Sequence, residues 1–122
     1  MHARRPPSEP AVNLDELLAR VDNDRELLRD LIVIFKSEFP GQMSALRLAT
    51  SERDVTTTEK MSHTLKGMLL SLAATRAASA AGELEQLGRR KDGAALAGAF
   101  ALLEEEVAQL LPALEVHLVE VG

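Results

Sequence analysis

The chain is organised around the stretch Met61-Ser62-His63-Thr64-Leu65-Lys66-Gly67-Met68-Leu69-Leu70-Ser71-Leu72-Ala73-Ala74. Its apolar side chains recur at the three- and four-residue spacing of one helix face, and they are Met61, Leu65, Met68, Leu69 and Leu72. At roughly 100° per residue, the opposite side of this helix carries Glu59, His63, Lys66, Gly67 and Leu70. The pattern therefore predicts an amphipathic helix that buries its apolar stripe and leaves the histidine in solvent.

The composition of the 122-residue chain indicates one helical domain with its own core. Apolar residues make up 46% of the chain and aromatic residues only 2%. The absence of cysteine excludes disulfides and thiolate metal sites. No run approaches the roughly 18 apolar residues of a membrane span, and the N-terminus lacks the apolar core of a signal peptide. We therefore expect a soluble cytoplasmic protein, or a soluble piece of a larger one, without a membrane partner.

The charge of the chain argues against a nucleic-acid partner. The formal net charge is −5, and aromatic residues that could stack on bases are nearly absent. The basic run Arg89-Arg90-Lys91 falls at the end of a predicted helix, where it most simply complements the helix dipole.

Start signals and apolar spacing divide the first half of the chain into an arm and two helices. Residues 1–12 hold three prolines and little to bury, which is typical of a disordered arm or linker. Asn13 is an N-cap for a short helix over about 14–20. A longer helix is predicted over about 23–50, kinked at Pro40 rather than broken, because the apolar period continues in phase past the proline.

Three more helices are predicted in the second half. Thr56 with Glu59 fits a capping box that starts the His63 helix, and Thr75 is a candidate cap for the helix after it. Small residues on the core side of that next helix favour close packing. A final helix follows Asp92-Gly93 and contains Pro112, which should kink it. Because the connections are short, we expect an all-α, antiparallel up-down-up-down four-helix bundle over residues 13–119, with a short extra N-terminal helix.

The exposed face around His63 has the chemistry of a phosphoryl acceptor. An imidazole has an unperturbed pKa of about 6.5, so it is largely an unprotonated nucleophile at neutral pH. Lys66, one turn away, offers an ammonium to phosphoryl oxygens. Gly67 removes a side chain that would crowd the ring, at a helix cost of about 0.5–1 kcal/mol relative to alanine. Leu70 presents an apolar side chain to solvent, as a docking surface does.

Three short motifs carry a family resemblance. His63-Thr64-Leu65-Lys66-Gly67 matches the pattern His-x-Leu-Lys-Gly without a gap. Ala73-Ala74 stands where a Gly-Ala pair is usual, and Leu84-Glu85 falls where the next helix carries a Leu-Glu pair. In these features the sequence resembles the histidine-containing phosphotransfer (HPt) domains of multistep two-component phosphorelays, over about residues 14–118.

The resemblance implies a role for each residue of the site. His63 would accept a phosphoryl group from the aspartate of one receiver domain and pass it to the aspartate of another. Lys66 would stabilise the phosphoryl charge, and Gly67 would leave room for the receiver. Glu85, or Gln86 beside it, would approach the imidazole from the next helix and orient the ring. The receiver would dock over the face that also carries Glu59 and Leu70.

The resemblance also implies partners and limits. The partners would be response-regulator receiver domains and a hybrid histidine kinase, and the chain would act as a monomeric phosphocarrier. It would have no kinase or ATPase activity and no cofactor of its own, since the Mg²⁺ belongs to the receiver. The residues after Gly67 are often small or polar in the family, whereas Met68, Leu69 and Leu70 are large and apolar here; Leu70 in particular bears on the choice of receiver.

Three other functions can be weighed against this one from the residues, and the adaptor is the alternative that stays open. A helical adaptor would dock a partner through the His63 face without chemistry. A metal-binding bundle would use Glu59 with His63, although the face is predicted outward and no second His/carboxylate pair projects into the core. A histidine-kinase dimerisation module would need a nucleotide domain that the chain does not hold.

Overall fold

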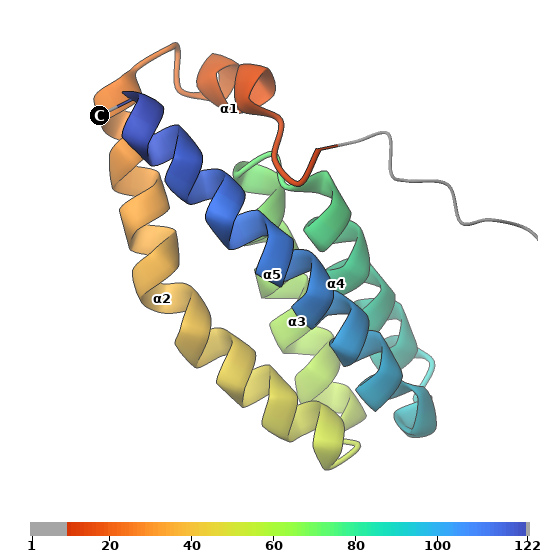
Figure 1. The fold of residues 1–122 in the computed structure, drawn as a ribbon. Coiled ribbons are helices and arrows are strands. Elements are labelled where there is room, and N and C mark those ends of the chain that lie inside the picture. Colours follow the sequence, from red (N-terminus) through yellow and green to blue (C-terminus); the bar gives the residue numbers. More distant parts are fainter. Residues whose placement is uncertain (1–9, 122) are drawn as a thin grey trace, which may run out of the picture.

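Five α-helices make up nearly all of the described chain (Figure 1). The computed structural model describes residues 10–121, and within that range the side chains of residues 10–116. The elements are α1 (Leu14–Arg20), α2 (Arg25–Ser51), α3 (Val55–Ser71), α4 (Thr75–Arg89), a 3-10 turn η1 (Gly93–Ala95) and α5 (Leu96–Val121). No strand occurs between residues 10 and 121, so the prediction of an all-α fold is confirmed.

Helices α2 to α5 run lengthwise beside one another, and α1 lies across the end where α2 begins (Figure 1). Three residues separate α2 from α3, α3 from α4, and α4 from η1. Such short connections reverse the chain direction, so successive helices are antiparallel. The predicted four-helix bundle with a short extra N-terminal helix is therefore confirmed.

The three turns close in the same way. Each contains one non-glycine residue in the left-handed region, namely Arg53 (φ 58°), Ala73 (φ 56°) and Lys91 (φ 60°). The N–H of the following residue donates back into the preceding helix at 2.9 Å, as Asp54 to Ala49, Ala74 to Leu69 and Asp92 to Leu87. These bonds satisfy carbonyls that a helix end otherwise leaves open.

The caps of α3 and α4 differ from the predicted ones. Asp54 is the N-cap of α3, and its Oδ1 accepts from the N–H of Thr57 at 3.1 Å. Hydrogen bonds from Thr57 lower the pKa of this carboxyl. The capping box predicted to start at Thr56 is therefore wrong, because Asp54 two residues earlier supplies the stronger acceptor. Thr75 is the first residue of α4 rather than its cap, which is Ala74.

Both long helices continue through their prolines. α2 is unbroken around Pro40, and α5 is unbroken around Pro112. Figure 1 shows α2 changing direction about half-way along its length. Both prolines are exposed, so the carbonyls that lose a backbone partner lie at the solvent side of each helix.

Val12 joins the bundle, although the sequence assigns it to the arm. Its side chain is buried in the core, and the neighbouring Asn13 N–H donates to the Ala73 carbonyl at 3.2 Å. The core of the bundle therefore includes Val12. Residues 1–9 of the predicted arm lie outside the described residues.

α3 packs most extensively against α4, and small residues make this possible. A Cβ at Gly88 would lie 2.7 Å from the Val55 carbonyl oxygen and 2.9 Å from the Glu59 nitrogen, so the two backbones approach too closely for any other residue. α3 also buries Thr58 and Ser62, which the apolar stripe did not include. This packing positions the outer edge of α4 beside His63.

Candidate functional site

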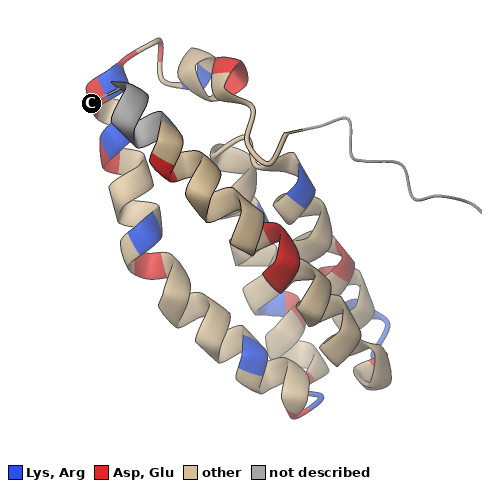
Figure 2. Cartoon of the chain, viewed as in Figure 1, with Lys and Arg blue, Asp and Glu red and all other residues tan. Residues whose placement is uncertain are grey.

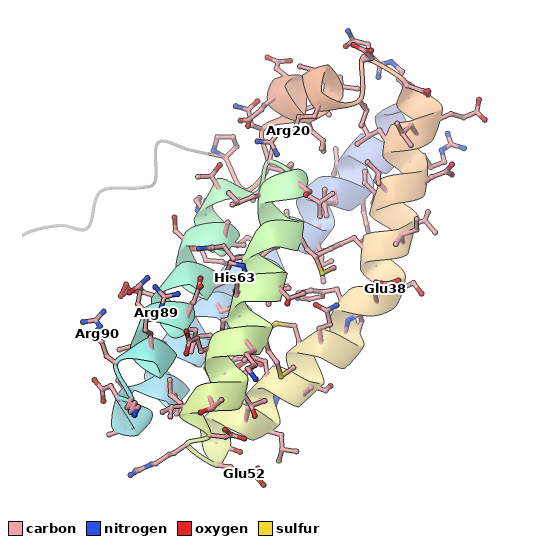
Figure 3. The ribbon with its side chains drawn as sticks, turned by 180° about the vertical axis from the view of Figure 1, so that it is seen from behind. Arg20, Glu38, Glu52, His63, Arg89 and Arg90 are labelled. Atoms are coloured by element: carbon pink, nitrogen blue, oxygen red, sulfur yellow. The ribbon has the colours of Figure 1, made fainter. Side chains whose placement is uncertain are left out.

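His63 lies near the middle of α3 with 70% of its side chain exposed (Figure 3). The buried side of α3 holds Leu65 and Leu69, and Leu72 is buried at the C-cap of the helix, as the stripe predicts, while Met61 and Met68 are half-buried. Because this side turns towards the core, the ring on the other side faces solvent. The bare backbone of Gly67 is exposed beside it, with no atom within 4 Å of where its Cβ would be.

A buried carboxylate from the neighbouring helix holds the ring. Glu85 on α4 is 4% exposed, and its Oε2 lies 2.8 Å from His63 Nδ1. The hydrogen bond from Lys66 lowers the pKa of Glu85 most; burial opposes that shift, and His63 adds to it. Glu85 is therefore ionised at neutral pH and can only accept, so Nδ1 carries the proton. In the neutral ring the lone pair then resides on Nε2.

Lys66 lies over α4 and pairs with the same carboxylate. Its Nζ is 2.9 Å from Glu85 Oε1, and a third of its side chain is exposed. A Cβ added at Gly82 would lie 3.4 Å from Lys66 Cδ, so the lysine stem passes close to the bare backbone of α4. The Glu85 carboxylate thus holds both the Lys66 ammonium and the His63 imidazole.

Arg89 is a part of the site that the sequence pattern did not reveal. One of its guanidinium nitrogens lies 3.0 Å from Glu85 Oε2, and its Nε lies 3.3 Å from Glu59 Oε2 on α3. Arg89 lies in the last turn of α4, where its charge also complements the helix dipole, which is the role predicted for it from the sequence. The available signal was the four-residue spacing from Glu85, which places both side chains on one face of α4.

A shallow open pocket lies at the surface beside His63. The pocket has a volume of about 460 Å³, and it is lined by Glu59, Lys60, His63, Thr64, Glu85 and Arg89. Figure 2 shows the acidic turn of α5, Glu104 to Glu106, at the front of the bundle, with α3 behind it. The site is therefore a small mixed-charge surface rather than part of an extended acidic one.

Leu70 and Gln86 are the remaining residues predicted for the site. Leu70 is 43% exposed, and its carbonyl accepts a hydrogen bond from Arg20 at the end of α1. Gln86 is exposed, and no contact with the imidazole is found for it among the described residues. Of the two ring-orienting candidates, Glu85 is thus the one that reaches His63.

Two other kinds of feature are absent from the described part of the chain. No group of three or more His, Cys, Asp or Glu side chains there is arranged to hold a metal ion. No helix in the same range is long and apolar enough to cross a membrane.

A family model described as Hpt domain matches residues 30–113. The matched segment begins in α2, contains all of α3 and α4, and extends into α5, so it includes both His63 and Glu85. Among curated proteins and among solved structures, none matches the chain.

Proposed function

The chain belongs to the Hpt domain family, which carries out histidine phosphotransfer in phosphorelays, and we propose that His63 is its phosphorylated residue. In this proposal His63 accepts a phosphoryl group from the aspartate of one receiver domain and passes it to the aspartate of another. One observation carries the assignment: the imidazole is exposed, and its Nδ1 is held by a buried carboxylate while Nε2 is left for phosphorus.

The transfer itself needs only the ring and the donor. The Nε2 lone pair forms a bond to phosphorus, and the bond between phosphorus and the donor aspartate oxygen breaks with its electron pair left on the carboxylate. Glu85 remains hydrogen-bonded to Nδ1–H and stabilises the positive charge that develops on the ring. The reverse sequence delivers the phosphoryl group to a second aspartate.

The neighbouring residues assist by charge and by access. Lys66 supplies an ammonium for the phosphoryl oxygens, and the bare backbone at Gly67 admits the receiver surface. Leu70 and Glu59, on either side of His63 along α3, contact the receiver. Glu59 is already held by Arg89, so its part of the docking surface is an ion pair rather than a lone carboxylate.

The partner supplies what this chain lacks. The Mg²⁺ that activates the aspartate is held by the receiver, and a hybrid histidine kinase supplies the phosphoryl group upstream. We propose that the domain acts in the cytoplasm as a monomer, with no kinase or ATPase activity of its own.

Incubation with phosphorylated receiver domains tests the proposal. Radiolabelled phosphate should move to the wild-type chain as an acid-labile, base-stable phosphoryl group. His63→Gln should take up none while unfolding at the wild-type temperature, because the side chain is largely exposed. Receiver binding without any transfer would instead identify a non-catalytic adaptor.

A further inference from the structure

We propose that Arg89 is a positioning residue that neutralises the Glu85 carboxylate when Lys66 leaves it for the phosphoryl group on His63. The inference rests on the proposed function of His63. It adds a residue that the HPt resemblance does not assign, and it assigns Arg89 no contact with the phosphoryl group.

Three cationic or proton-donating groups share one buried carboxylate. Lys66 Nζ contacts Oε1 at 2.9 Å, while His63 Nδ1 and a guanidinium nitrogen of Arg89 contact Oε2 at 2.8 Å and 3.0 Å. The Glu85 side chain is only 4% exposed. Water is therefore a poor substitute for any partner that leaves.

Once a phosphoryl group is bound to His63, it competes with the Glu85 carboxylate for the Lys66 ammonium. A phosphoryl group adds negative charge and strong acceptor oxygens. If Lys66 moves to these oxygens, Glu85 loses its contact at Oε1, and a buried charge without a counterion is strongly unfavourable. Without another cation beside Glu85, Lys66 would stay bound to Glu85, and the phosphoryl group would lack a counterion.

Arg89 is held where it can serve as that other cation. Its guanidinium contacts Glu85 and Glu59 with different nitrogens, which a planar group with several donors allows. At Gly88, immediately before it, α4 approaches the α3 backbone closely. Figure 3 shows Arg90 extending away from the bundle, whereas Arg89 reaches Glu59 on α3.

The proposal predicts that Arg89 matters only while residue 85 is charged. In the Glu85 background, Arg89→Gln should slow phosphoryl uptake on the order of tenfold, a coupling of the size seen between contacting groups. In the Glu85→Gln background the same change should have no effect, because a neutral amide needs no counterion. A residue that contacted the phosphoryl group directly would slow uptake in both backgrounds.

Phosphoramidate is a donor that makes the measurement independent of any partner. Its phosphorus–nitrogen bond breaks as His63 Nε2 bonds to phosphorus, and its nitrogen takes a proton and leaves as ammonia. Uptake rates would be compared for the wild type, Arg89→Gln, Glu85→Gln and the double variant. Arg89→Lys, which keeps the charge, should retain most of the rate, and Arg90→Gln is the matched control that removes a neighbouring charge.

The possible outcomes separate the two proposals. The inference is supported if Arg89→Gln slows phosphoryl uptake in the Glu85 background and not in the Glu85→Gln background. Equal rates for Arg89→Gln and the wild type, slowing in both backgrounds, or equal slowing by Arg90→Gln would overturn it. Failure of every phosphorylated receiver to label His63 would count against the receiver-to-receiver function, whatever the phosphoramidate rates show.

Thermal unfolding would show whether Arg89→Gln folds. If it does not fold, a second variant, Glu59→Gln, still tests the inference. Glu59→Gln removes one anchor of the guanidinium while keeping its charge. It should also slow uptake only when residue 85 is glutamate. If Arg89→Gln does not fold, the absence of this background dependence in Glu59→Gln would refute the inference.

Discussion

Glu85 Oε2 lies 2.8 Å from His63 Nδ1, so the nucleophile on α3 is oriented by a carboxylate buried in α4. The carboxylate is ionised, which makes it an acceptor and assigns the proton to Nδ1. The reactive nitrogen is thus defined by packing between two helices.

Removal of this carboxylate should alter the tautomer of the ring. In Glu85→Ala, the neutral imidazole should lose its fixed Nδ1–H form and sample both tautomers, which ¹⁵N NMR of the ring nitrogens distinguishes. Phosphoryl uptake should fall on the order of tenfold, equivalent to about 1.4 kcal/mol of lost orientation. Gln86→Ala is the control, and an unchanged tautomer in Glu85→Ala would contradict this account of the site.

Gly67→Ala should separate stability from phosphotransfer. Nothing lies within 4 Å of the Cβ position, so the free energy of unfolding should rise by about 0.5–1 kcal/mol through helix propensity. Transfer from a receiver should nevertheless fall, because the added methyl group occupies the face on which the receiver docks. Gly98→Ala on α5, equally open, should stabilise without slowing transfer. Equal transfer rates for Gly67→Ala and the wild type would argue against docking there.

Gly88→Ala should destabilise the bundle at the crossing of α3 and α4. The new Cβ would lie 2.7 Å and 2.9 Å from backbone atoms of α3, and backbone cannot yield as a side chain does. Overpacking of this kind costs about 1–3 kcal/mol in the free energy of unfolding, measurable by urea titration. Gly82→Ala meets only the flexible Lys66 stem at 3.4 Å and should be tolerated. Equal stability of the two variants would disprove the close approach.

Glu85 should make the stability of the domain depend on acidic pH. Its folded-state pKa lies below the ordinary value of 4.5, so the native state holds fewer protons than the unfolded state near that pH. The stability from the ionised carboxylate is therefore present above about pH 4.5 and is lost as pH falls through the lowered pKa. Urea titrations at several pH values should show a smaller acid loss in Glu85→Gln than in the wild type. Glu83→Gln, at an exposed position of α4, should leave the acid loss unchanged.

The sequence alone was sufficient for the outward side of α3 and for the order of the helices, although it misplaced the caps of α3 and α4. Helical spacing placed His63, Gly67 and Leu70 on the outward side of α3, and short connections indicated the antiparallel bundle. These features follow from the 3.6-residue period and from turn length, both of which are local properties of the chain.

Tertiary structure alone decided which residues of α4 meet the imidazole. Glu85 and Gln86 are adjacent in sequence, and only the rotation of α4 about its own axis brings the former to His63. The same packing brings Arg89 to Glu59. The rotation and depth of one helix against another are set by the residues between them, such as Gly88 at the close approach of α3 and α4, and spacing along a single helix carries no measure of either.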